Sequence, residues 1–155
     1  MRTRIAFAAL AAIALTLQLI PVERTNPPVR ERIAAPDTVL DVLRGSCFDC
    51  HSHDTQWPWY AYVAPVSWFV TGHVNHAREH LNFSTWDAYD AEERREKFEE
   101  IWEEVEKGEM PLRSYLRLHR DARLTERDLA IIEAWTSSVL DETETSQPAP
   151  DGVTP

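Results

Sequence analysis

Apolar residues recur every three or four positions through much of the chain, the spacing that places them on one face of an α-helix. No segment of useful length alternates apolar and polar residues as a half-buried strand does, and no internal repeat is present. The helical pattern covers four segments: 37–45, 65–81, 92–107 and 125–139. We therefore predict an all-α fold built around one small helical domain.

Capping residues predict where these helices begin and end. Asp37 and Pro65 open the first two helices, and Gly45 and Gly108 end the first and the third. Two capping-box patterns precede the later helices: Ser84 with Asp87, and Thr125 with Asp128.

Each long helix carries an apolar stripe that we expect to face the interior. In 65–81 the stripe includes His73, so this imidazole is expected to point inward as well. The residues of the three stripes are Val66, Phe69, Val70, His73, Ala77 and Leu81; then Phe98, Ile101, Trp102 and Val105; and finally Leu129, Ile132, Trp135 and Val139.

The N-terminus has the pattern of an export signal or a membrane anchor. Arg2 and Arg4 precede a stretch, 5–20, that contains no charge. Its end offers signal peptidase no small residues, which favours an uncleaved anchor, although 16 residues fall short of the ~20 that span a bilayer comfortably. Because the positive flank stays inside, we expect a protein held at the inner membrane and facing the periplasm, or a periplasmic protein if the segment is cleaved.

Prolines and polar residues divide the chain into four predicted parts. Residues 1–21 form the signal-anchor or transmembrane segment, and 22–36 form a proline-rich, extended tether. The folded domain is expected at 37–140, and the polar segment 141–155 is expected to be a disordered tail.

Composition limits the class of partner. The chain has 155 residues, 43% of them apolar, which is enough for one modest core. Its 16 basic and 26 acidic side chains give a net charge of −10, and this excludes a nucleic-acid partner because phosphate binding needs a basic face. Two cysteines are too few for a disulfide framework, so their local pattern must explain them.

That local pattern is C-x-x-C-H, the attachment motif of c-type haem. Two thiols three positions apart, Cys47 and Cys50, are spaced to reach the two vinyl groups on one haem edge and form thioethers. The next residue, His51, then lies under the iron as its proximal ligand. Haem c is attached to exported proteins, and this chain has an export pattern. We therefore predict one covalent haem c.

Three alternatives to haem attachment compete for the two cysteines. A thioredoxin-type redox pair requires a βαβ setting that the pattern lacks, and a Cys47–Cys50 disulfide closes too small a loop to stabilise much. A zinc site stays open, because the motif and His53 are followed by three histidines that fall within about 60° of one another on a helix: His73, His76 and His80.

A second axial ligand for the iron is expected from Met110. Gly108 ends a helix and Pro111 stiffens the chain, so the thioether is presented from a constrained loop. Thioether ligation raises the reduction potential relative to two imidazoles. Methionine also fills cores, and His73 is the alternative sixth ligand.

Aromatic residues follow the motif closely and suit the faces of a porphyrin. We expect Trp59 and Tyr60 to touch it. Arg78 and Arg113 are candidates for pairing with a propionate.

Taken together, residues 36–136 resemble the bacterial haem-binding domain family of small c-type cytochromes. The resemblance implies one covalent haem on a helical domain behind an N-terminal membrane segment, with Met110 at the methionine before proline. Ala77-Arg78 stands where the family commonly has glycine-arginine. The segments that carry the resemblance are 47–55, 57–60, 64–68, 81–84, 108–111 with Tyr115, 119–124 and Trp135.

The ligand set predicts function. With His51 and Met110 both bound, the iron has no open position for a substrate, so we predict a membrane-tethered electron carrier rather than an enzyme. Its acidic surface favours a redox partner with a basic docking patch, and haem attachment requires the cytochrome c maturation machinery. Two alternatives remain: a haem protein with an open or labile sixth site, peroxidase-like or sensing gas or redox state, and a haem-free zinc-binding module.

Overall fold

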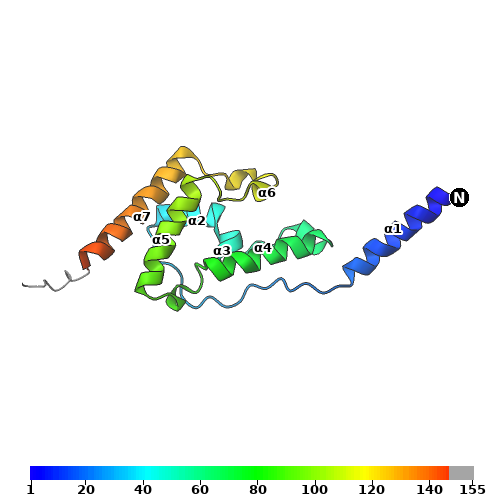
Figure 1. The fold of residues 1–155 in the computed structure, drawn as a ribbon, viewed down its shortest axis with the longest axis horizontal. Coiled ribbons are helices and arrows are strands. Elements are labelled where there is room, and N and C mark those ends of the chain that lie inside the picture. Colours follow the sequence, from blue (N-terminus) through cyan, green and yellow to red (C-terminus); the bar gives the residue numbers. More distant parts are fainter. Residues whose placement is uncertain (147–155) are drawn as a thin grey trace, which may run out of the picture. The chain divides into compact units, whose positions relative to one another are not determined.

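A computed structural model describes residues 1–146, and within that range the chain forms helices and no strand (Figure 1). The all-α prediction is confirmed. A single β-bridge joins Glu31 and Thr85. The elements are α1 (Arg2–Gln18), α2 (Asp37–Ser46), α3 (Phe48–His51), η1 (Trp59–Tyr62), α4 (Val66–His80), η2 (Trp86–Ala88), α5 (Ala91–Glu106), α6 (Arg113–Leu116), η3 (Arg120–Ala122) and α7 (Glu126–Ser146), where η marks a 3₁₀ helix.

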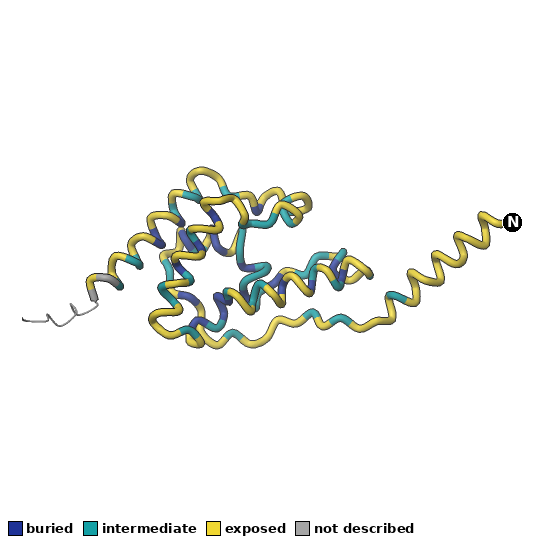
Figure 2. Tube along the Cα trace, viewed as in Figure 1, coloured by how far each residue is buried: buried dark blue, intermediate teal, exposed yellow. Residues whose placement is uncertain are grey.

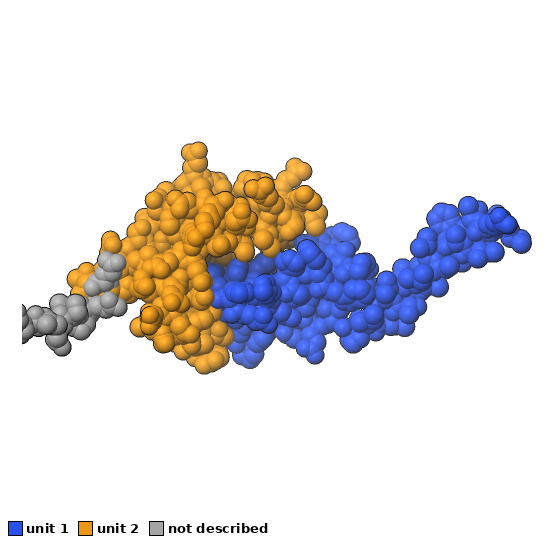
Figure 3. All heavy atoms as spheres, in the orientation of Figure 1, with its two compact units in different colours: residues 1–29, 48–84 blue, residues 30–47, 85–155 orange. Residues whose placement is uncertain are grey.

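The chain divides into two compact units, coloured separately in Figure 3. Unit 1 comprises residues 1–29 and 48–84, and unit 2 comprises residues 30–47 and the chain from 85 onward. The predicted domain 37–140 includes parts of both units, and its bounds stay a prediction. The division falls inside the C-x-x-C-H motif, directly after Cys47.

Unit 2 is a helical core built on aromatic contacts. The Phe98 ring of α5 packs edge-on against Trp135 of α7, at 5.1 Å between ring centroids, and against Trp86 at 5.5 Å. Ile101, Val105 and Ile132 are buried beside them, as the sequence predicts. Helix α2 packs on α7 through its own buried face of Val39, Val42 and Leu43.

The start of α5 differs from the predicted one. Asp90 caps this helix: its carboxylate accepts the N–H groups of Glu92 and Glu93, and the Glu93 carboxylate accepts the N–H of Asp90. The predicted cap pair is wrong, because Ser84 is buried and bonded to the N–H of His53, and Asp87 lies in η2 and pairs with Arg30. The Thr125–Asp128 capping box at the start of α7 is confirmed.

Unit 1 has a small and largely polar interior. Helices α3 and η1 pack on α4. The unit buries four apolar side chains and six polar ones (Figure 2): Phe48, Ala61, Val74 and Phe83, and then Ser52, Thr55, Ser67, Thr71, Asn82 and Ser84.

The buried face of α4 is not the predicted stripe. Ser67, Thr71 and Val74 face inward, whereas Val66 and Phe69 are 43% and 57% exposed. His73 is exposed too, so its predicted inward position is wrong. The physical reason is tertiary packing: η1 and α3 pack on α4, and the side of the helix that they leave uncovered includes Val66 and Phe69.

Helix α1 contains 17 residues, and none of them is buried. At 1.5 Å per residue it is about 25 Å long, shorter than the ~30 Å hydrocarbon layer. Within residues 1–146 no helix is both long and apolar enough to cross a membrane, so the structure does not support the predicted membrane helix.

The predicted tether is extended over 22–29, but it is docked on unit 1 rather than free. Arg24 donates to the carbonyl of Ala61 at 3.2 Å, and Asn26 donates to that of Thr55 at 2.9 Å. At the other end of the chain, α7 continues to Ser146, six residues into the predicted disordered tail. Residues 147–155 lie outside the described residues.

Candidate haem site

The C-x-x-C-H motif lies where α2 ends and α3 begins. Cys47 caps α2 by donating its N–H to the carbonyl of Leu43 at 2.8 Å. Cys50 and His51 belong to the single turn of α3. Both cysteines are in the described part of the chain, and no disulfide joins them.

The imidazole of His51 is held in one orientation by the backbone. Its Nδ1 lies 3.0 Å from the carbonyl oxygen of Leu81, directly after the end of α4. An Nδ1–H that donates to this carbonyl leaves Nε2 unprotonated, which is the nitrogen and the tautomer that a metal binds. Burial lowers the pKa of His51 below its usual 6.5, so the neutral, ligating form prevails at pH 7.

The backbone of His51 is fixed as well. Its carbonyl accepts the N–H of Phe83 at 2.8 Å, and the Phe83 ring stacks on Phe48 with centroids 5.4 Å apart. The hydroxyl of Ser52 donates to the carbonyl of Phe48 at 2.7 Å. The single helical turn that carries His51, the expected iron ligand, is thus held in place by the bonds to Phe83 and Ser52.

Cys50 lies in a poorly solvated, negatively charged surrounding. Burial, and then the Asp49 carboxylate, raise the pKa of its thiol to about 11, while the Arg78 guanidinium acts in the opposite direction. The pKa of Tyr60 is raised by burial and by the charges of Asp49 and Cys50, so its phenol lies within electrostatic reach of the attachment cysteine. Trp59 is 78% exposed, and its predicted porphyrin contact stays a prediction.

The loop that follows His51 folds back onto α3. Asp49 organises it: its backbone carbonyl accepts the hydroxyl of Thr55 at 2.8 Å, and its carboxylate accepts the N–H of Gln56 at 2.8 Å. The aromatic segment 57–60 is thereby returned to the neighbourhood of Cys50.

Arg78 joins three segments of unit 1, a role that the sequence analysis missed. Its Nε donates to the carbonyl of Ser52 at 2.8 Å, and one terminal nitrogen donates to the Thr55 hydroxyl at 2.8 Å. The guanidinium also donates to the Thr25 carbonyl at 2.9 Å and to the Asn26 side chain at 3.2 Å. These protein acceptors engage the group, which argues against its predicted use for a propionate. Arg78 is the first charged residue after the uncharged segment 55–77. This isolated charge is the feature of the sequence that could have indicated a structural role for Arg78.

The other histidines do not form a metal site. His73 lies on the exposed side of α4, with its Nδ1 2.9 Å from the Phe69 carbonyl and its ring against the Phe69 ring. The rings of His76 and His80 lie 4.4 Å apart at the surface. Throughout residues 1–146, no three His, Cys, Asp or Glu side chains are grouped to hold a metal ion, so the zinc alternative finds no support in the geometry.

Met110 is positioned by the end of α5. Gly108 adopts φ +68°, its N–H donates to the carbonyl of Val105, and the N–H of Glu109 donates to that of Glu104. This pair of bonds is a Schellman motif. The N–H of Met110 donates to the same Glu104 carbonyl at 3.1 Å, so the predicted constrained loop is confirmed. Met110 belongs to unit 2 and His51 to unit 1, and joint ligation of one iron stays a prediction.

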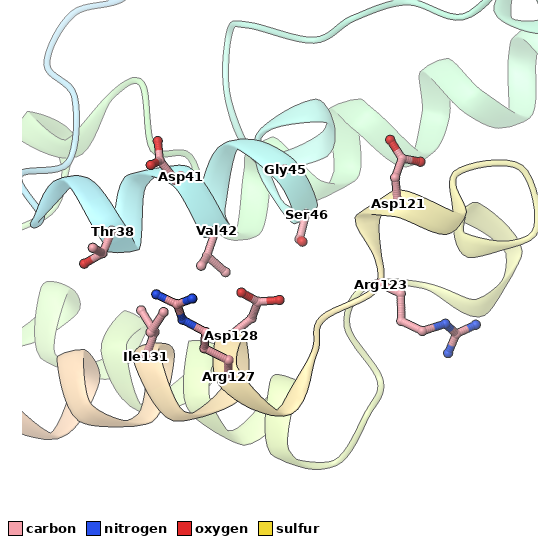
Figure 4. A pocket seen from close by; sticks show the side chains of 10 residues that line it. All are labelled: Thr38, Asp41, Val42, Gly45, Ser46, Asp121, Arg123, Arg127, Asp128 and Ile131. Carbon is pink, nitrogen blue, oxygen red and sulfur yellow. The ribbon is translucent and has the colours of Figure 1, made fainter.

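Unit 2 also contains an open pocket of about 340 Å³, between α2, η3 and the start of α7 (Figure 4). Val42 and Ser46 point from α2 toward Arg127 and Asp128 of α7. Its lining mixes acidic and basic side chains and includes none of the predicted haem residues, so we assign no ligand to it.

Cys50 and His51 lie in a unit whose own apolar core is small, and Cys47 precedes them by three and four positions in the chain; two thiols beside a histidine oriented by the backbone fit a large flat apolar group such as haem. These features define a helical haem-binding protein. A family model described as "Haem-binding domain" matches residues 12–138, and the chain belongs to this family. Neither the curated proteins nor the solved structures contain a match.

Proposed function

We propose that this protein is an exported monohaem c-type cytochrome that carries single electrons. Cys47 and Cys50 would hold the haem as thioethers, and His51 and Met110 would be the two axial ligands. When bound, the haem supplies a one-electron Fe(III)/Fe(II) couple, and the chain supplies orientation, shielding from water and charge.

The observation that carries the proposal is the bond from His51 Nδ1 to the Leu81 carbonyl. It prepares Nε2 for iron before any metal is bound, and it is made by a residue of the C-x-x-C-H motif itself. A histidine with a merely structural role would have no need of this motif, and a redox thiol pair would have no need of this histidine.

Met110 supports electron transfer over substrate chemistry. Three backbone N–H groups at the end of α5, those of Gly108, Glu109 and Met110, satisfy carbonyls of that helix and fix the residue next to Pro111. A thioether presented by a fixed loop suits a permanent sixth ligand, which closes the iron to peroxide and oxygen.

The charge distribution supports a basic redox partner. Unit 1 contains four arginines and four carboxylates and is neutral in total, so the whole net charge of −10 belongs to unit 2. Electrostatic attraction of this magnitude raises association rates with a basic surface, and it weakens as salt is added. We propose that unit 2 provides the docking surface.

For localisation, we propose export to the periplasm directed by the N-terminal segment, with Arg2 and Arg4 remaining on the cytoplasmic side during export. Cell fractionation after expression tests this directly. Recovery of the haem-loaded chain in the cytoplasm would refute it.

Mass spectrometry and visible spectroscopy test the haem assignment. After expression with the cytochrome c maturation machinery, the denatured chain should retain the mass of one haem, and Cys47→Ala with Cys50→Ala should abolish it. The ferric protein should show the weak absorption near the red end of the spectrum that marks sulfur ligation. Its survival in Met110→Ala would exclude Met110 as the ligand.

Carbon monoxide tests the number of open positions. The reduced wild-type protein should bind carbon monoxide slowly or not at all, whereas Met110→Ala should bind it readily. Rapid, stoichiometric binding to the wild-type protein would replace the carrier assignment with an open-site haem protein.

A further inference from the structure

Unit 1 exposes a group of large apolar side chains at one end, around η1 and the first turn of α4. Val66 and Phe69 lie three residues apart on one side of α4, and Tyr62 ends η1 with Val63 directly after it. We call this set the apolar end: Tyr62, Val63, Val66 and Phe69, with 50%, 46%, 43% and 57% of their surfaces exposed.

The apolar end lies within a charge-free part of the chain. Residues 55–77 contain no Asp, Glu, Lys or Arg, although 27% of all residues are charged. The water-facing surface of an acidic protein normally carries charges, and unit 2 of this chain does so. Absence of carboxylates removes the repulsion that would otherwise keep an acidic protein from an anionic surface.

The apolar end is also directly joined to the N-terminal segment. Gln18, the last residue of α1, donates to the carbonyl of Tyr62 at 2.7 Å and accepts the N–H of Ala64 at 3.0 Å. Arg24 then lies with its guanidinium 4.6 Å from the centre of the Tyr62 ring. The C-terminal end of helix α1 is therefore hydrogen-bonded directly to the apolar end.

Beyond Arg4, helix α1 carries no charged side chain, and its larger apolar side chains are exposed: Ile5, Phe7, Leu10, Ile13 and Leu15. Leu19 and Ile20, 81% and 51% exposed, continue this apolar surface up to the apolar end. Lipid is the environment that suits such a helix. Tyrosine beside apolar aliphatic residues is typical of the headgroup region of a bilayer.

We propose that unit 1 rests on the surface of a phospholipid bilayer through the apolar end. This inference rests on the proposed export of the protein, which brings the chain to a membrane, and it assigns a lipid-facing surface that needs no spanning helix. The charged unit, unit 2, remains the part that meets soluble partners.

Hydroxyl-radical footprinting of the full-length holoprotein in phosphatidylcholine–phosphatidylglycerol vesicles tests the proposal. Phe69 of unit 1 and Leu118 of unit 2 have similar exposure, 57% and 68%, so without lipid their oxidation rates, corrected for side-chain reactivity, should agree within about twofold. Vesicles should slow Phe69 about tenfold relative to Leu118, because lipid excludes water from its ring. Equal corrected rates in vesicles would overturn the proposal.

A variant pair tests whether the apolar side chains themselves hold unit 1 on lipid. Val66→Gln with Phe69→Gln keeps good helix formers on α4 and should remove the vesicle protection of Tyr62. Leu118→Gln is the matched control and should leave it unchanged. Retained Tyr62 protection in the first variant would show that α1 alone holds the chain, and would refute the role of the apolar end.

These outcomes are separable from the proposed function. Haem content is measured from the absorption of the same samples, and export is measured by fractionation. A chain with no haem, or one not exported, would sink the proposed function while its vesicle footprint still reports on the surface. A protein partner on the apolar end would appear as full oxidation of Phe69 in vesicles.

Discussion

Replacing Arg78 with glutamine should destabilise unit 1 by about 2 kcal/mol. The guanidinium donates to two part-buried acceptors, the Ser52 carbonyl and the Thr55 hydroxyl, each at 2.8 Å. Two more acceptors, on Thr25 and Asn26, are exposed. A part-buried, charge-assisted bond contributes ~1 kcal/mol net, and an exposed one a few tenths. Glutamine is too short to replace the fork of donors.

Denaturant unfolding of the holoprotein, followed by haem absorption and far-ultraviolet circular dichroism, measures the effect. Arg78→Lys should lose about half as much, since it keeps the charge without the planar fork. Arg44→Gln is the control, because Arg44 makes one exposed ion pair with Asp41 and should cost only a few tenths of a kcal/mol. A change below ~0.5 kcal/mol for Arg78→Gln would show that Arg78 does not join these segments in solution.

Three further changes have defined outcomes. Gly108→Ala should cost about 1 kcal/mol in unfolding measurements, because φ is +68° there while an added Cβ meets no neighbour; a neutral effect would contradict the left-handed cap. Phe83→Ala should cost ~3–4 kcal/mol, since the ring is buried against Phe48 beside His51; retained stability would deny it a core position. In haem-free protein, stability should fall by up to ~1.4 kcal/mol per pH unit below pH 6.5, because the unfolded chain then takes up a proton that buried, neutral His51 does not; urea midpoints that fall equally in His51→Gln would contradict this.

The long helices could be predicted from local patterns. The stripe of α5 has a period that only a helix satisfies, and Gly108 and the Thr125–Asp128 pair mark ends by chemistry that acts within a few residues. The Ser84–Asp87 pattern gave a wrong prediction because it, too, considers only residues close together in the sequence. Its residues have the right types, but Ser84 is engaged by a residue 31 positions away, which no local pattern reveals.

The inward face of α4 could not be predicted from hydrophobicity. Ser67 and Thr71 are buried on a helix that packs against η1 and α3, whereas Val66 and Phe69 of the same helix are exposed. A pattern of apolar residues identifies a surface that avoids water. It does not distinguish a protein neighbour from another apolar environment.

In the candidate site, too, the residues that are adjacent in the chain could be predicted, and those that the fold brings together could not. Cys47, Cys50 and His51 are adjacent in the chain, and their chemistry follows from spacing alone. The Leu81 carbonyl that orients His51 lies 30 residues away, so it required the fold. Tyr60 lies within electrostatic reach of Cys50 after a loop in which Asp49 accepts hydrogen bonds from Thr55 and Gln56, and this folding back could not be read from the sequence.

The acceptor that orients His51 is a main-chain oxygen, so no replacement of the Leu81 side chain can delete it. The orientation of the His51 ring instead depends on where α4 ends. The N–H of Leu81 donates to the carbonyl of Ala77 and closes the last turn, and the carbonyl of Leu81 points toward the imidazole. One inserted residue in α4 would rotate that oxygen by about 100°. The length of α4, rather than the side chain at position 81, therefore sets the direction of the His51 ring.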